Sequence, residues 1–177
     1  GDYKLAIKWF SRCLSIDKTS SAVRYELSNI YIFIGDYTTA MDLLEDAVKY
    51  NPNNIWYKLQ LANIYKKQSM ITQACNLYED LYKKNQDRID FIFMQASLYV
   101  SAKEWKKAIK KYDKIEKLKG IAEFTSIEKY KIYRKLNKSK DAEKEIFNLI
   151  KEFPQKSEYL IMLADVYILD KKDSKVL

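Results

Sequence analysis

Apolar side chains recur along this chain at steps of three and four residues, with charged and polar positions between them. In four segments an alanine is followed four residues later by a large side chain, and three residues beyond that by a small or apolar one. This spacing places the three side chains on one face of an α-helix. With only three glycines and two prolines in 177 residues, the pattern predicts an all-α fold. The four sets are Ala6, Phe10 and Cys13; Ala40, Leu44 and Ala47; Ala74, Tyr78 and Leu81; Ala108, Tyr112 and Ile115.

The helical pattern repeats at a fixed interval of 34 residues. Five alanines and five tyrosines keep this step, and a period of this length is typical of stacked helix pairs. We therefore expect residues 1–177 to form a single array, with a half repeat at 1–20, full repeats at 21–54, 55–88, 89–122 and 123–156, and a half repeat at 157–177. The incomplete repeats at both ends predict a fragment of a longer chain. The recurring residues are Ala6, Ala40, Ala74, Ala108 and Ala142, and Tyr31, Tyr65, Tyr99, Tyr133 and Tyr167.

Turn residues fall where the repeat would need them. Gly1-Asp2-Tyr3 and Gly35-Asp36-Tyr37 stand between the predicted helices of a repeat. At Asn51-Pro52-Asn53-Asn54 the proline would end one helix and an asparagine would cap the next. Phe153-Pro154 repeats that exit 102 residues, or three periods, later.

With this period and these turns, the chain resembles the tetratricopeptide repeat family. The resemblance implies a right-handed superhelical solenoid of antiparallel helix pairs, in which the alanine allows two helices to cross closely and the tyrosine packs between neighbours. No repeat of this kind buries its apolar face alone. Four residues depart from the pattern. From those in repeat 123–156 we expect looser packing or a changed packing angle in that repeat. They are Gln95 and Lys129 in place of leucine, Tyr130 in place of a small residue, and Asn137 in place of the turn glycine.

The resemblance also implies where a ligand would bind, because first helices of successive repeats line the concave face in this family. We expect that face to hold a protein or peptide segment through apolar anchors and amide groups. Packing between adjacent first helices, or cover by flanking sequence, is the alternative role for the same residues. The family's clamp for a C-terminal carboxylate is not expected, because Asp90 would repel it. The predicted groove residues are Tyr25, Asn29, Trp56, Leu59, Asn63, Lys66, Phe93, Ser97, Phe124, Ile127, Lys131 and Arg134.

The net charge of +8 is concentrated in one segment. Residues 103–140 hold 14 Lys and Arg against 5 Asp and Glu. Six of these lysines lie on a predicted helix over 104–118, opposite its apolar stripe, and so on the convex side. A solvated face is one interpretation, and binding of nucleic acid or an anionic surface through phosphate neutralisation is the alternative. The residues of this alternative basic patch are Lys106, Lys107, Lys110, Lys111 and Lys114.

Nothing in the sequence predicts an enzyme, a cofactor or a metal site. The chain has no histidine, no glycine-rich phosphate loop and no Cys-x-x-Cys pair. Paired carboxylates such as Glu45-Asp46 and Glu79-Asp80 are expected to be surface charge. Cys13 and Cys75 are expected to be buried thiols at packing positions, which favours a reducing compartment such as the cytoplasm, whereas a signal before residue 1 would direct the protein to the cell envelope. No apolar run is long enough to predict a membrane span.

Overall fold

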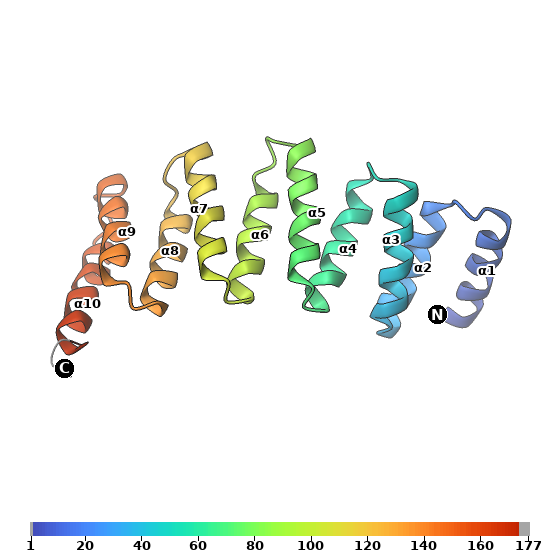
Figure 1. The fold of residues 1–177 in the computed structure, drawn as a ribbon, viewed down its shortest axis with the longest axis horizontal. Helices are drawn as coiled ribbons and strands as arrows, with labels where there is room; N and C mark the ends of the chain where they lie inside the picture. The colour runs from blue at the N-terminus through green and yellow to red at the C-terminus, as the bar shows by residue number, and fades with distance from the viewer. Residues whose placement is uncertain (1, 174–177) are drawn as a thin grey trace. The chain divides into compact units, whose positions relative to one another are not determined.

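The computed structural model describes the backbone of residues 2–173 and the side chains of residues 2–168. Helices and short turns make up this part of the chain, which contains no strand, and the all-α fold class is confirmed (Figure 1). The ten helices are α1 (Tyr3–Ile16), α2 (Ser21–Ile34), α3 (Tyr37–Tyr50), α4 (Ile55–Lys67), α5 (Ile71–Lys84), α6 (Asp90–Ser101), α7 (Trp105–Lys119), α8 (Glu123–Lys135), α9 (Ser139–Glu152) and α10 (Glu158–Asp173).

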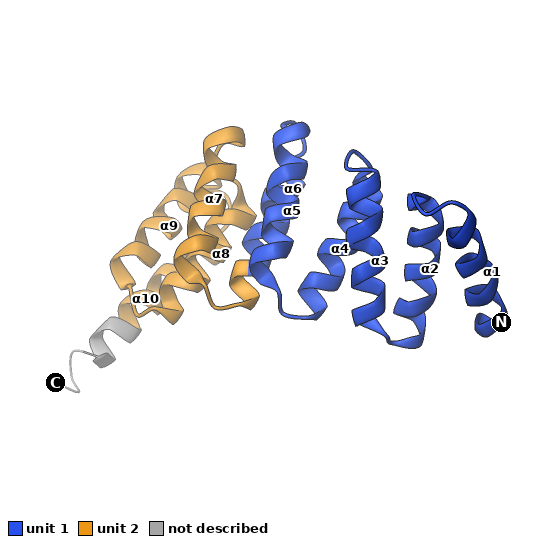
Figure 2. Ribbon diagram, turned by 45° about the vertical axis from the view of Figure 1, so that its right-hand side comes forward, with its two compact units in different colours: residues 1–98 blue, residues 99–177 orange. Residues whose placement is uncertain are grey.

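Each predicted full repeat contains one helix pair. Residues 21–54 hold α2 and α3, and the next three repeats hold α4 with α5, α6 with α7, and α8 with α9. The chain divides into two compact units, residues 1–98 and 99–177, coloured separately in Figure 2. That the whole chain forms one array stays a prediction, because the division falls within α6.

The turn inside each repeat has the same backbone geometry every 34 residues. Its second helix starts two residues after a residue with positive φ, and the carbonyl of the recurring tyrosine accepts a hydrogen bond from the N–H five residues later. These are features of a Schellman-type helix end, which satisfies carbonyls that the helix leaves unpaired. The positive φ angles are 85° at Gly35, 58° at Ser69, 58° at Lys103 and 54° at Asn137, and the N···O distances are 2.9 Å for Asp36 to Tyr31, 2.8 Å for Met70 to Tyr65, 2.8 Å for Glu104 to Tyr99 and 2.9 Å for Lys138 to Tyr133.

The predicted asparagine cap is present, and Asp36 provides a second cap. Asn54 Oδ1 accepts hydrogen bonds from the backbone N–H groups of Trp56 and Tyr57, at 2.9 and 3.3 Å, and so caps α4. Asp36 Oδ1 accepts from the N–H of Thr39 at 3.1 Å and caps α3 in the same way. The residue Gly1 of the matching N-terminal turn lies outside the described residues.

The recurring alanines lie in the core. Ala40, Ala74, Ala108 and Ala142 are each 0% exposed, as close helix crossings require, and Ala6 is half-buried. They stand on α3, α5, α7 and α9, the second helix of each pair. A methyl group at these positions lets the paired helices approach without a gap.

The structure corrects the expected burial of one cysteine and shows how the large Tyr130 is packed. Cys75 is buried as expected, but Cys13 is exposed, so the expectation of a buried thiol at Cys13 was wrong. Cys13 lies on α1, where the described residues provide no preceding helix to cover it. In repeat 123–156 the large Tyr130 packs against a cluster formed by residues of α9 and α10 that includes Ile146 and Tyr159.

Candidate functional site

The predicted groove residues of α4 share one exposed side of that helix. Trp56 is 71% exposed, and Asn63 and Lys66 are exposed seven and ten residues further along. Steps of seven and three residues bring side chains back to nearly the same helix face. An indole, a carboxamide and an ammonium group therefore follow one another along the surface of unit 1.

The neighbouring positions on α2 hold this face in place. The ring of Tyr25 lies 5.0 Å from that of Tyr57, and Gln60 Nε2 donates a 3.2 Å hydrogen bond to Asn29 Oδ1. Tyr25 and Asn29 are half-buried, as is Leu59 on α4. These contacts join the two first helices, so both predicted members on α2 take part in packing while part of each remains exposed.

A depression opens between α2 and α4 on this side. Its walls contain the exposed Asn63 and Lys66, the amide of Gln60 on α4, and one apolar side chain from each helix. Lys67, also at its edge, donates a 3.0 Å hydrogen bond to the hydroxyl of Tyr37 and lies over that ring at 4.6 Å. The site is therefore a partly apolar hollow with amide donors and acceptors and a positive rim. The lining residues are Ile32, Gln60, Asn63, Ile64, Lys66 and Lys67.

The remaining predicted groove residues do not line this depression. On α6, Phe93 is half-buried and Ser97 is exposed. In unit 2, Phe124 is exposed with its ring edge-on to Tyr112, and Ile127 packs against the core cluster of α9 and α10.

Two further predicted members, Lys131 and Arg134, also lie on α8 in unit 2. Lys131 forms a 2.6 Å ion pair with Glu128, and Arg134 is half-buried. That they extend the unit 1 face stays a prediction.

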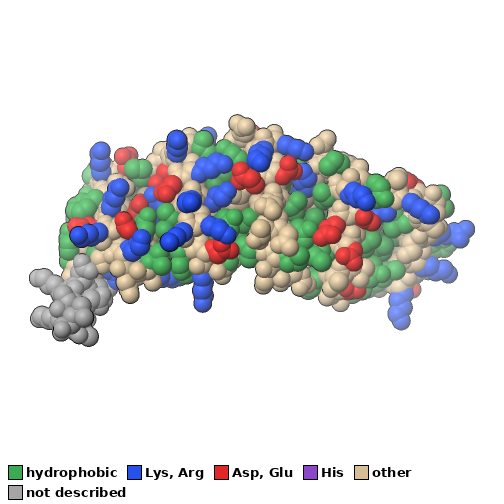
Figure 3. Space-filling view, viewed as in Figure 1, with side chains coloured by type: hydrophobic (Ala, Val, Ile, Leu, Met, Phe, Trp, Pro, Cys, Tyr) green, Lys and Arg blue, Asp and Glu red, His purple; other side chains and the backbone are tan. Residues whose placement is uncertain are grey.

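The lysines of the alternative basic patch are partly engaged within unit 2. Lys106 and Lys110 are exposed, whereas Lys107 forms an ion pair with Glu104 and lies 5.3 Å from the centre of the Tyr99 ring. Lys111 and Lys114 are half-buried and interact with other groups of the protein. On the face drawn in Figure 3, basic side chains alternate with acidic and apolar ones in the region of α7. The arrangement does not favour nucleic-acid binding.

Two carboxylates expected to be idle surface charge instead pair with buried bases. Arg24 on α2 contacts Asp46 on α3 at 3.3 Å, and Lys58 on α4 forms an ion pair with Asp80 on α5. Both bases are buried and both acids are partly exposed. The hydrogen bond from Lys58 holds the pKa of Asp80 below its ordinary value. The 34-residue step between the two bases, and between the two acids, was the signal that could have predicted these pairs.

Unit 2 has a different buried charge cluster, centred on Lys129 of α8. Its Nζ lies 3.0 Å from Asp113, 2.7 Å from Glu116 and 3.0 Å from Glu145, so α7, α8 and α9 are joined at one point. Burial opposes the charge of Lys129, but the three carboxylates outweigh it and raise the pKa of that ammonium. Burial raises the pKa of Glu145, and the nearby carboxylates of Glu116 and Asp113 raise it further, although the bond from Lys129 lowers it. The departure at Lys129 is thus compensated locally.

Two of the recurring tyrosines form hydrogen bonds to the preceding helix pair. Tyr65 on α4 donates a 2.7 Å hydrogen bond to Glu45 on α3, and burial together with this bond raises the pKa of Tyr65. Tyr167 on α10 donates in the same sense to Glu143 on α9. These hydroxyls therefore bond across the boundary between one repeat and the next.

Within the described residues, no three His, Cys, Asp or Glu side chains are grouped so as to hold a metal ion. None of the helices in this part of the chain combines the length and the apolar character that a membrane span requires.

Comparison with known proteins identifies the fold. Residues 1–60 match the family model described as tetratricopeptide repeat. A tetratricopeptide repeat protein from Parabacteroides merdae is 18% identical, with 99% of this chain and 70% of that chain covered at a TM-score of 0.63. MamA from Desulfovibrio magneticus is 15% identical, with 88% and 87% covered at 0.60. YrrB, described as a tetratricopeptide repeat protein with an unusual peptide-binding site, is 12% identical, with 95% and 87% covered at 0.56. No curated protein matches the chain.

The chain is therefore a helical-repeat protein with the fold of tetratricopeptide repeat structures. The model of the tetratricopeptide repeat family matches residues 1–60, and the similar solved structures share the fold over nearly all of the chain. The predicted resemblance is confirmed.

Proposed function

We propose that the face of α2 and α4 in unit 1 binds a peptide or an extended protein segment, and that the protein is a non-catalytic scaffold. The observation that carries this proposal is the depression beside Asn63 and Lys66, on the same side of α4 as the exposed Trp56. Proteins of this family are generally scaffolds of this class, and the similar YrrB is described as having a peptide-binding site.

The chemistry of the face fits an extended backbone. A carboxamide such as that of Asn63 can both donate to a peptide carbonyl and accept from a peptide N–H. Trp56 provides a large apolar surface with little conformational entropy to lose, and tryptophan is enriched among the residues that dominate binding energies. Gln60 and Asn29 are already bonded to each other, so part of the face is ordered before a ligand arrives.

The proposal is tested by selecting ligands from a random peptide library and measuring their affinity for variants. We expect Trp56→Ala and Asn63→Ala each to weaken the selected peptides at least tenfold, since such anchors are worth more than about 1.4 kcal/mol. Thr72→Ala, at an exposed position of α5, is the matched control and should change nothing. Peptides that bind all three variants equally well, or a library that yields no ligand, would refute binding at this face.

A further inference from the structure

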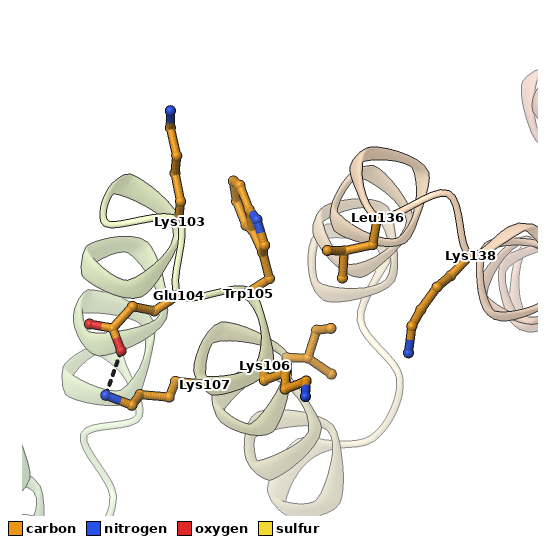
Figure 4. Close-up of a pocket in the computed structure, with 8 residues that line it drawn as sticks. Lys103, Glu104, Trp105, Lys106, Lys107, Leu136 and Lys138 are labelled. Atoms are coloured by element: carbon orange, nitrogen blue, oxygen red, sulfur yellow. Dashed lines mark ion pairs between the residues drawn. The ribbon is translucent and has the colours of Figure 1, made fainter.

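A second cavity lies entirely within unit 2, at the end of the helices where the turns α6–α7 and α8–α9 come together. Trp105 stands at the start of α7 and Leu136 at the end of α8, and they face each other across the opening, with Ile109 completing the apolar lining (Figure 4). The volume is about 420 Å³. That is within the range of cavities that enclose a ligand group. Neither the predicted groove nor the α2–α4 depression includes these three residues.

The mouth of this cavity is basic. Lys103, Lys106, Lys107 and Lys138 line it beside a single acid, Glu104, which forms an ion pair with Lys107. Figure 4 shows Lys103 beside Trp105, and Lys138 directed toward the space between the two turns. Among the described residues, neither Lys103 nor Lys106 is in an ion pair. The cavity is therefore an apolar hollow with uncompensated positive charge on more than one side.

Nearby groups do not cancel this charge. Lys138 is 3.7 Å from Asp141, a pair exposed enough to be strongly screened, and Lys135 lies 5.2 Å from the centre of the Trp105 ring. The ammonium of Lys135 over Trp105 adds another positive group at the rim and holds the indole in position.

We propose that this cavity binds an acidic peptide segment that carries one large apolar side chain. The apolar side chain would lie between Trp105 and Leu136, and carboxylates before and after it would pair with Lys103, Lys106 and Lys138. The charge complementarity selects this occupant, because lysines from two separate turns surround one apolar hollow. A lipid or free anion offers one charged head group, whereas a peptide places several carboxylates around one apolar group.

A nucleic acid fits the site less well. A phosphate backbone needs a continuous basic track, but further along α7 the half-buried Lys111 and Lys114 already interact within the protein. The site is also distinct from the unit 1 face, so each proposal can fail without the other.

The experiment measures fluorescence anisotropy of labelled peptides with the whole chain. The first peptide has one phenylalanine flanked by glutamates and aspartates; the second replaces phenylalanine by alanine, and the third replaces the acids by lysines. A mixed-sequence oligonucleotide and anionic phospholipid vesicles are the competing probes. The protein variants are the charge reversal Lys103→Glu with Lys106→Glu, and a matched reversal of two exposed lysines at the far end of α7, Lys117→Glu with Lys119→Glu.

We expect the first peptide to bind at least tenfold more tightly than the other two. We expect the Lys103→Glu/Lys106→Glu variant to lose at least tenfold in affinity, while Lys117→Glu/Lys119→Glu and Trp56→Ala keep it. Equal binding of the alanine peptide would show attraction by charge alone and would overturn the proposal. Equal loss in both charge reversals, tighter binding of the oligonucleotide or vesicles, or no binding of the first peptide would also overturn it.

Discussion

At the scale of single residues, the 34-residue period is most visible at the turn position of each repeat. Gly35, Ser69, Lys103 and Asn137 all have positive φ, although only one of them is glycine. For an L-residue the left-handed region costs about 1–2 kcal/mol, and asparagine tolerates it better than serine or lysine. The sequence predicted this turn from Gly35, and the structure shows that the other three adopt it with backbone strain.

This strain predicts a difference between two glycine substitutions. Ser69→Gly should raise the free energy of unfolding by about 0.5–1 kcal/mol, because relief of strain exceeds the greater freedom of glycine in the unfolded chain. Asn137→Gly should change it by less than about 0.5 kcal/mol. Urea unfolding followed by circular dichroism gives both values. An equal effect of the two substitutions would contradict the assigned cause.

A second prediction concerns Gln95, which stands where Leu27 and Leu61 stand in the preceding repeats. Gln95 is fully buried, and both atoms of its carboxamide lack a hydrogen-bond partner among the described residues. Gln95→Leu should raise the free energy of unfolding by about 1–3 kcal/mol, the cost of burying an unpaired polar group. The reverse change, Leu61→Gln, should lower it at the equivalent buried position, and thermal melts of both variants provide the comparison. Lower stability of Gln95→Leu would show that the amide has a role.

At the scale of helices, buried bases join neighbouring elements in both units, but by different residues. In unit 1 the joining residues are Arg24 and Lys58, each paired with one acid of the following helix. In unit 2 a single base, Lys129, joins α8 to carboxylates of α7 and α9. The sequence showed Lys129 only as a departure from the repeat. Its partners lie 13 and 16 residues away, and these separations do not follow the 34-residue period.

The cluster predicts opposite results for its base and its most buried acid. Lys129→Met should lower the free energy of unfolding at neutral pH by about 3–5 kcal/mol, since it leaves buried carboxylates without a counter-charge. Glu145→Gln should leave it equal or higher. The folded-state pKa of Glu145 is raised, so its carboxyl favours folding below the unfolded-state pKa, and this contribution is lost as pH rises through the folded-state value.

Unfolding by urea at neutral pH and near pH 4.5 measures these effects. The advantage of Glu145→Gln over the parent protein should shrink at the lower pH, because the raised pKa of the parent carboxyl favours its protonated form in the folded state. A Lys129→Met protein as stable as the parent would contradict the role assigned to the cluster.

At the scale of the whole molecule, the sequence predicted the parts that repeat and missed those that do not. The period predicts the helix positions, the turns, and buried alanines such as Ala74 and Ala108, because every repeat packs its two helices in the same way. The exposure of Cys13 depends on what covers α1. The division into two compact units, and the cavity between Trp105 and Leu136, depend on side-chain sizes and contacts particular to one repeat.

The most direct test of the account is the effect of enlarging a recurring alanine, since close helix crossing at these positions underlies both the fold and the faces it presents. Ala74→Leu should lower the free energy of unfolding by about 1–3 kcal/mol, because Ala74 is fully buried on α5, the helix that packs against α4. The same change at Ala22, an exposed residue of α2, should alter it by less than about 0.5 kcal/mol. Urea unfolding curves that show the two leucine variants to be equally stable would contradict the account.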